Sequence, residues 1–134
     1  MTRGRPHRAV FDTPLLVAYR DADQVVIEFL AEWVDGERPI ILSAVSALEV
    51  IARSPDPDDR RVRLAFIKEA VILPLTAREA RVAHKLVLTV PVPTRLTSDD
   101  ALVAATAVIH KLPLYSTDPG RYATVPGLTT LPAR

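Results

Sequence analysis

Short apolar runs alternate along this chain with longer stretches in which apolar residues recur at helical spacing. The apolar runs predict five strands, at residues 9–11, 39–42, 71–75, 112–116 and 128–131. The longer stretches predict six helices, at residues 13–19, 23–34, 43–53, 58–70, 76–88 and 100–111. Because parallel strands need long crossover connections, this order predicts an α/β fold, a three-layer α/β/α sandwich with a mostly parallel central sheet.

Local signals place several element boundaries. Thr13 and Pro14 are typical of the N-cap and first position of a helix. Thr76 and Glu79 have the spacing of a capping box, in which each side chain bonds to the other residue's backbone. Pro74 lacks the N–H that a central strand needs, so the third strand is expected at an edge or to end there.

The size and cysteine content narrow the class of protein. A chain of 134 residues is long enough to bury its own core, so we expect a single domain over residues 1–134 with a flexible basic N-terminus at residues 1–7. The absence of cysteine excludes disulfides and thiolate zinc sites. No apolar run approaches the ~18 residues of a membrane span. We therefore expect a cytoplasmic protein with no membrane segment.

The charge is nearly balanced but unevenly distributed. The net charge is +1, so the whole molecule has no strong attraction for nucleic acid. However, three arginines lie within the first eight residues, and three more lie within residues 58–63. Such basic segments can steer an anionic partner locally.

Acidic residues follow or face the carboxyl ends of the predicted strands. Asp12 directly follows the first strand, Glu49 lies on the helix after the second, and Asp118 follows the fourth. Asp99 and Asp100 open the apolar helix that precedes the fourth strand. Each acid alone is also typical of a turn, a solvated helix position or a helix cap. Together they indicate a shared site, because ligands of parallel α/β sheets bind outside the carboxyl ends of the strands.

A cluster of four carboxylates indicates a hard metal ion. Unpaired carboxylates repel each other when they lie close together, unless a cation neutralises them or some bind protons. Oxygen ligands without His or Cys favour Mg²⁺, or alternatively Mn²⁺. A bound ion of this kind lowers the pKa of a water ligand and polarises a phosphate, which are the requirements of phosphodiester hydrolysis.

Three segments give the chain a family resemblance. They are VFDTPLLVAY at residues 10–19, LSAVSALEVIA at 42–52 and SDDALVAATAVIHKLPLYSTD at 98–118. The last is the most specific, because two acids lie 18 residues apart across a helix–strand unit. In order and spacing these segments resemble PIN-domain ribonucleases, in particular the VapC-type toxins of toxin–antitoxin pairs. The resemblance spans nearly the whole chain.

The resemblance assigns four acids to the catalytic site: Asp12, Glu49, Asp100 and Asp118. It implies that Asp12 and Asp100 ligate the metal, and that Asp118 does so directly or through water. Glu49 would orient the attacking water or take its proton. Thr13 and Ser116 would hydrogen-bond the carboxylates from a surrounding layer.

Two details of these segments leave alternatives open. Either Ser98 or Asp99 is expected to cap its helix, and we favour Asp100 as the metal ligand because it directly precedes the run Ala-Leu-Val-Ala-Ala. The family often has Ser after Asp-Thr, where this chain has Pro14. The proline removes a hydroxyl and an N–H that could place a metal-bound water, although it suits a helix start.

The resemblance also implies an activity and partners. The expected function is a Mg²⁺-dependent endoribonuclease toxin that leaves a 5′-phosphate and a 3′-hydroxyl. Its expected partners are an RNA substrate, a cognate antitoxin protein and a second copy of the chain in a homodimer. Two alternatives remain open, a catalytically silent PIN-like interaction module and a receiver-like phosphoacceptor domain. The absence of a Gly-rich phosphate loop disfavours nucleotide-binding enzymes.

Overall fold

A five-stranded parallel sheet forms the centre of the protein. The computed structural model describes residues 4–134. The strands are β1 (Val10–Phe11), β2 (Ile41–Ser43), β3 (Val71–Leu73), β4 (Leu114–Ser116) and β5 (Thr130–Pro132). Their order in the sheet is β3-β2-β1-β4-β5, and every pairing is parallel. The predicted α/β sandwich is confirmed, and β3 is an edge strand that ends before Pro74.

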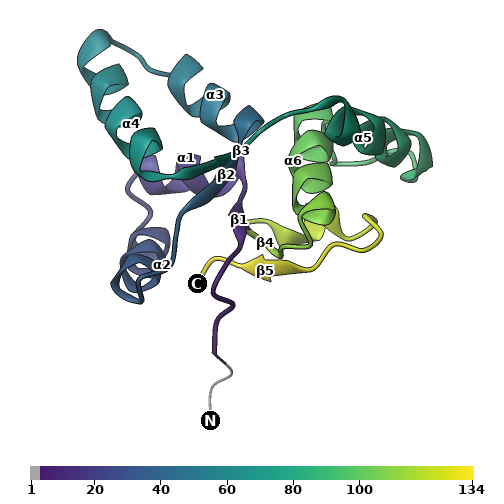
Figure 1. Ribbon diagram of the computed structural model, residues 1–134, viewed down its shortest axis with the longest axis horizontal. Helices are drawn as coiled ribbons and strands as arrows, with labels where there is room; N and C mark the ends of the chain where they lie inside the picture. Colours follow the sequence, from purple (N-terminus) through teal and green to yellow (C-terminus); the bar gives the residue numbers. More distant parts are fainter. Residues whose placement is uncertain (1–3) are drawn as a thin grey trace.

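Six α-helices flank this sheet. They are α1 (Thr13–Arg20), α2 (Gln24–Asp35), α3 (Ala44–Ala52), α4 (Pro57–Glu69), α5 (Ala77–Thr89) and α6 (Ser98–Ile109). A short 3₁₀ helix, η1 (Pro119–Tyr122), follows β4. Helices α5 and α6 lie on one side of the sheet, and α1, α2 and α4 lie on the other (Figure 1). The predicted order of strands and helices is therefore confirmed.

Two apolar cores form because successive strand side chains point to opposite faces. Val10, Ile41 and Leu114 belong to the core that α5 and α6 cover. Their neighbours along the strands belong to the core under α1 and α2, namely Phe11, Leu42 and Tyr115.

The aromatic side chains of α2 belong to this second core. Phe29 and Trp33 are buried and pack against Phe11 and Tyr115. The Trp33 indole N–H donates to the Pro39 carbonyl at 2.8 Å. Phe29 and Trp33 therefore fill the interior of the protein.

The helix caps correct two sequence predictions. The N-cap of α1 is Asp12, whereas Thr13 is already helical. The N-cap of α6 is Thr97, which precedes both predicted alternatives, Ser98 and Asp99. Asn, Asp, Ser and Thr all make good N-caps, so local preference does not choose among adjacent candidates. The predicted capping box between Thr76 and Glu79 is confirmed.

The N-terminal segment, from residue 4 on, enters β1 from below in Figure 1. Arg5 pairs with Glu32 at 2.8 Å and lies over the Phe29 ring. Arg3, part of the predicted flexible basic N-terminus, lies outside the described residues. Within residues 4–134, no helix is long and apolar enough to cross a bilayer.

Candidate functional site

A pocket of about 510 Å³ opens beside the carboxyl ends of β1 and β2. It is bordered by α1 along its length, by the first turn of α6, by α3 and by η1. Glu49, Asp99, Asp100 and Arg121 are among the side chains that line it. The crossover connections of a parallel sheet bring these distant segments to one edge.

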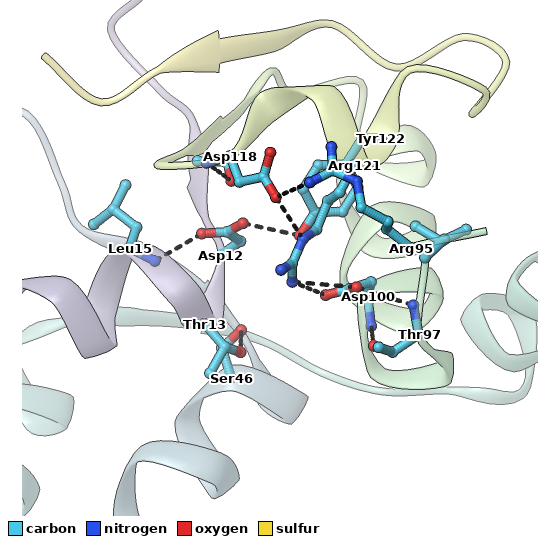
Figure 2. Close-up of polar contacts among 12 residues, drawn as sticks. Asp12, Thr13, Leu15, Ser46, Arg95, Thr97, Asp100, Asp118, Arg121 and Tyr122 are labelled. Atoms are coloured by element: carbon cyan, nitrogen blue, oxygen red, sulfur yellow. Dashed lines mark hydrogen bonds and ion pairs between the residues drawn. The ribbon is translucent and has the colours of Figure 1, made fainter.

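Asp12 lies fully buried at the end of β1. Its Oδ1 accepts a hydrogen bond from the Leu15 backbone N–H at 2.9 Å, and its Oδ2 accepts one from the Tyr122 hydroxyl at 2.9 Å (Figure 2). Burial raises the pKa of Asp12, and hydrogen bonding by Ser116, Leu15 and Tyr122 offsets part of this rise.

Tyr122 belongs to η1 and is itself buried. Burial and the neighbouring carboxylates of Asp12 and Asp100 raise its pKa, so its hydroxyl remains a donor at neutral pH. This hydroxyl therefore fixes one oxygen of the first acid.

Asp100 lies at the start of α6 and faces the interior. Its Oδ2 accepts a hydrogen bond from the Thr97 backbone N–H, while the Thr97 hydroxyl accepts one from the Asp100 N–H, which completes a capping box. Arg121 Nη1 lies 3.2 Å and 3.3 Å from the two carboxylate oxygens. Asp99 is exposed, although it borders the same pocket.

Asp118 lies between β4 and η1. Its backbone N–H donates to Ser116 Oγ at 3.0 Å, and Ser116 is fully buried. Its carboxylate pairs with Arg95 at 2.8 Å, and Arg121 Nε lies 3.5 Å from the same oxygen. Asp118 is therefore neutralised by two arginines.

Arg121 connects the acids of the site (Figure 2). Burial acts to lower its pKa, but the charge of Asp100 and its hydrogen bond outweigh burial and raise the pKa, so the guanidinium stays charged. Within residues 4–134, the Arg121 Nε is one of a few buried side-chain nitrogens without a hydrogen-bond acceptor. Arg121 and Tyr122 together bring Asp12, Asp100 and Asp118 into one network.

Glu49 joins the pocket from α3 and makes no hydrogen bond or ion pair with the three aspartates. The Thr13 hydroxyl donates to Glu49 Oε1 at 3.0 Å and lies 3.0 Å from Ser46 Oγ. Arg53, one turn along α3, lies 3.4 Å from Glu49 Oε2. The predicted supporting residue Thr13 thus orients Glu49, while Ser116 supports Asp118 and Asp12.

The donor chemistry of this site fits a hard divalent cation, but the side chains as they lie do not form a closed ligand set. Across residues 4–134, no three His, Cys, Asp or Glu side chains are grouped closely enough to hold a metal ion. Arg121 supplies the positive charge to Asp100 and Asp118 in this arrangement. Carboxylate oxygens are the ligands that Mg²⁺ and Mn²⁺ prefer.

The sequence patterns did not identify Arg95, Arg121 and Tyr122 as site residues. Arg121 and Tyr122 stand in a Pro-Gly turn, and Arg95 stands in a Pro-rich loop. Residues of this kind in loops usually face solvent. Their role becomes visible only from their contacts with the acids of the site. Three of these four contacts join residues more than 20 positions apart in the sequence.

The structure defines a class of protein, a parallel α/β sandwich with acidic side chains at the carboxyl edge of its sheet. Within this class, the chain belongs to the PIN domain family, whose pattern matches residues 9–126. The predicted family is therefore confirmed. No curated protein is similar enough in sequence to be matched.

Solved structures share this fold at low sequence identity. A toxin–antitoxin complex from Klebsiella pneumoniae has a TM-score of 0.76 and 20% identity, covering 95% of this chain and 98% of that chain. VapBC-1 from nontypeable Haemophilus influenzae has a TM-score of 0.76 and 13% identity, covering 93% and 97%. FitAcB from Neisseria gonorrhoeae has a TM-score of 0.70 and 18% identity, covering 94% and 98%.

Proposed function

We propose that this protein is a divalent-metal-dependent endoribonuclease and the toxin of a type II toxin–antitoxin pair. The observation that carries the proposal is the convergence of Asp12, Asp100 and Asp118 on two adjacent residues, Arg121 and Tyr122. Membership of the PIN family and the likeness to toxin–antitoxin complexes support it.

In this proposal Asp12, Asp100 and Asp118 hold Mg²⁺, for which Mn²⁺ can substitute. The bound ion would activate a water molecule and neutralise charge on the scissile phosphate. The Leu15 N–H and the Tyr122 hydroxyl fix the two oxygens of Asp12, so this carboxylate is oriented before metal binds.

Glu49 is the proposed proton acceptor. It borders the pocket, and the hydroxyl of Thr13 holds one of its oxygens. The other oxygen is only loosely paired with Arg53, at 3.4 Å. Glu49 would orient the attacking water and take its proton as the bond between phosphorus and the 3′-oxygen breaks. The leaving 3′-oxygen would take a proton from solvent, which gives a 5′-phosphate and a 3′-hydroxyl.

The proposed partners follow from the same class of protein. The single domain would act in the cytoplasm as a homodimer, and a cognate antitoxin would cover the acidic pocket. The basic residues near this pocket, Arg53 and Arg95, would attract the RNA backbone that the carboxylates repel.

Induced expression followed by sequencing of RNA ends tests this function. We expect new 5′-phosphate ends and growth arrest with the wild-type chain, and neither with Asp12→Asn. Folding of the variant is checked by circular dichroism. Full RNA cleavage by a folded Asp12→Asn protein would contradict the proposal.

A catalytically silent PIN-like interaction module is the second candidate. The observation that favours it is that Arg121 and Arg95 already neutralise Asp100 and Asp118. Calorimetric titration with Mn²⁺ separates the two functions, because the silent module predicts no binding at millimolar metal.

A further inference from the structure

We propose that Arg121 is an internal counter-ion that a divalent metal must displace from Asp100 and Asp118, and that this side chain thereby sets the metal affinity of the site. The inference rests on the proposed metal-binding role of these acids. It does not depend on RNA being the substrate.

The position of the Arg121 guanidinium is the first observation. Nη1 lies 3.2 Å and 3.3 Å from the two oxygens of Asp100, and Nε lies 3.5 Å from Asp118 Oδ2. A cation that neutralised both carboxylates at once would have to take over these contacts. Arg121 and the metal would therefore compete for the same carboxylate oxygens.

The charges favour exchange of one cation for the other. Asp12, Asp100 and Asp118 provide three carboxylates, which face Arg121 and Arg95. In the metal-free protein Arg121 reduces the repulsion among these acids. A divalent ion supplies twice the charge of Arg121 at the same place, which favours the exchange. The loss of the Arg121 contacts opposes metal binding.

The contacts of Arg121 are of a kind that can be released. A single nitrogen, Nη1, serves both oxygens of Asp100, so the two-nitrogen fork that makes arginine–carboxylate pairs strong is not formed. The side chain is 25% exposed, and among residues 4–134 its Nε finds no hydrogen-bond acceptor.

A hollow next to the site can accept the Arg121 side chain when it leaves the aspartates. It measures about 220 Å³ and is lined by Thr94, Arg95, Gly120 and Arg121 itself. Arg121 thus borders both the acidic pocket and this hollow. A change of side-chain rotamer could move the guanidinium from one to the other without moving η1.

Arg95 provides a matched control. It pairs with Asp118 at 2.8 Å but makes no ion pair with Asp100, and its side chain is 65% exposed. Its loss removes the same charge from the edge of the site. Arg121, by contrast, pairs with both Asp100 and Asp118.

The test is calorimetric titration with Mn²⁺, without RNA, of the wild-type protein, Arg121→Gln and Arg95→Gln. We expect Arg121→Gln to bind Mn²⁺ at least about tenfold more tightly than wild type, which corresponds to about 1.4 kcal/mol. Arg95→Gln is expected to stay within about threefold, because exposed ion pairs are weak. Equal or weaker binding by Arg121→Gln would overturn the inference.

Thermal unfolding gives a second measurement. Without metal, Arg121→Gln is expected to melt below wild type, and Mn²⁺ should raise its midpoint more than that of wild type. If Arg121→Gln does not fold, Arg121→Lys replaces it, because lysine keeps the charge but loses the planar geometry. Arg121→Lys should bind Mn²⁺ several-fold more tightly than wild type, and unchanged binding would overturn the inference.

The outcomes also separate this inference from the proposed function. Equal Mn²⁺ affinity in all three proteins, together with RNA cleavage, rejects the role of Arg121 and leaves the nuclease in place. Tighter Mn²⁺ binding by Arg121→Gln, with no RNA cleavage by the wild-type protein, supports the role of Arg121 and rejects the nuclease. No Mn²⁺ binding by any of the proteins rejects both.

Discussion

The Tyr122 hydroxyl donates to Asp12 Oδ2 at 2.9 Å and joins residues 110 positions apart in the sequence. Both side chains are buried, so water is not available to replace this bond. The contact ties the end of β1 to η1 and thereby positions the first acid relative to Asp118 and Arg121. It connects the stability of the fold with the geometry of the proposed metal site.

Tyr122→Phe tests this contact. Removing the hydroxyl leaves a buried carboxylate oxygen without its donor, which is expected to cost about 1–2 kcal/mol of unfolding free energy. The thermal midpoint should fall by roughly 4–7 °C for a domain of this size. Tyr19→Phe is the control, because Tyr19 is 40% exposed. A Tyr122→Phe protein as stable as the control would show that the bond does not stabilise the fold.

Asp12→Asn is expected to stabilise the metal-free protein while abolishing activity. Burial raises the pKa of Asp12, which means that the ionised carboxylate costs free energy in the fold at neutral pH. Asparagine removes this charge and can still accept from the Leu15 N–H as an N-cap. The gain should appear as a higher midpoint of urea unfolding at pH 7 in EDTA.

A lower midpoint for Asp12→Asn would contradict this explanation. It would mean that the hydrogen bonds to the carboxylate outweigh the cost of burying it. Asp21→Asn, at an exposed position after α1, is the control for the loss of one negative charge.

Glu49→Gln separates proton transfer from metal binding. Because Glu49 contacts Thr13 and Arg53 and none of the three aspartates, its substitution should leave Mn²⁺ affinity unchanged. RNA cleavage should fall by about 10²–10⁴-fold, the range expected for loss of a general base. Glu69→Gln, exposed at the end of α4, is the control. Unchanged cleavage by Glu49→Gln would exclude this role.

The capping box of α5 predicts a pH dependence of stability. The hydrogen bond from the Thr76 hydroxyl lowers the pKa of Glu79 in the folded protein. Its contribution is therefore fully present above the unfolded pKa of about 4.3 and is lost as pH falls through the lower folded value. Glu79→Gln should unfold at lower urea than wild type at pH 7, with the difference shrinking below about pH 4.

Glu28→Gln controls for the loss of an exposed carboxylate on α2. If the difference between wild type and Glu79→Gln stays constant between pH 7 and pH 3, the charge of Glu79 does not contribute to the stability of α5.

Local sequence patterns predicted the elements because each signal lies within the element it defines. The apolar runs and helical spacing give the order of strands and helices, and the strand ends place Asp12 and Asp118 at one edge of the sheet. The exact caps were wrong where Thr97, Ser98 and Asp99 stand in a row, because only the reciprocal bond between Thr97 and Asp100 selects among them.

The counter-ion network could not be predicted from the sequence. Arg121 reaches Asp100 across 21 positions, and Tyr122 reaches Asp12 across 110. These contacts depend on the register between η1 and the neighbouring strand end, which no local pattern encodes. A turn arginine beside an acid is by itself typical of a solvated surface position.

RNA cleavage by purified Asp100→Asn and Asp99→Asn proteins in Mg²⁺ tests the proposed nuclease most directly. The two aspartates are adjacent, but Asp100 is buried against Arg121 whereas Asp99 is exposed. We expect Asp100→Asn to lose cleavage by at least about 10²-fold and Asp99→Asn to retain it within a few-fold. Cleavage at the wild-type rate by a folded Asp100→Asn protein would contradict the proposed metal site.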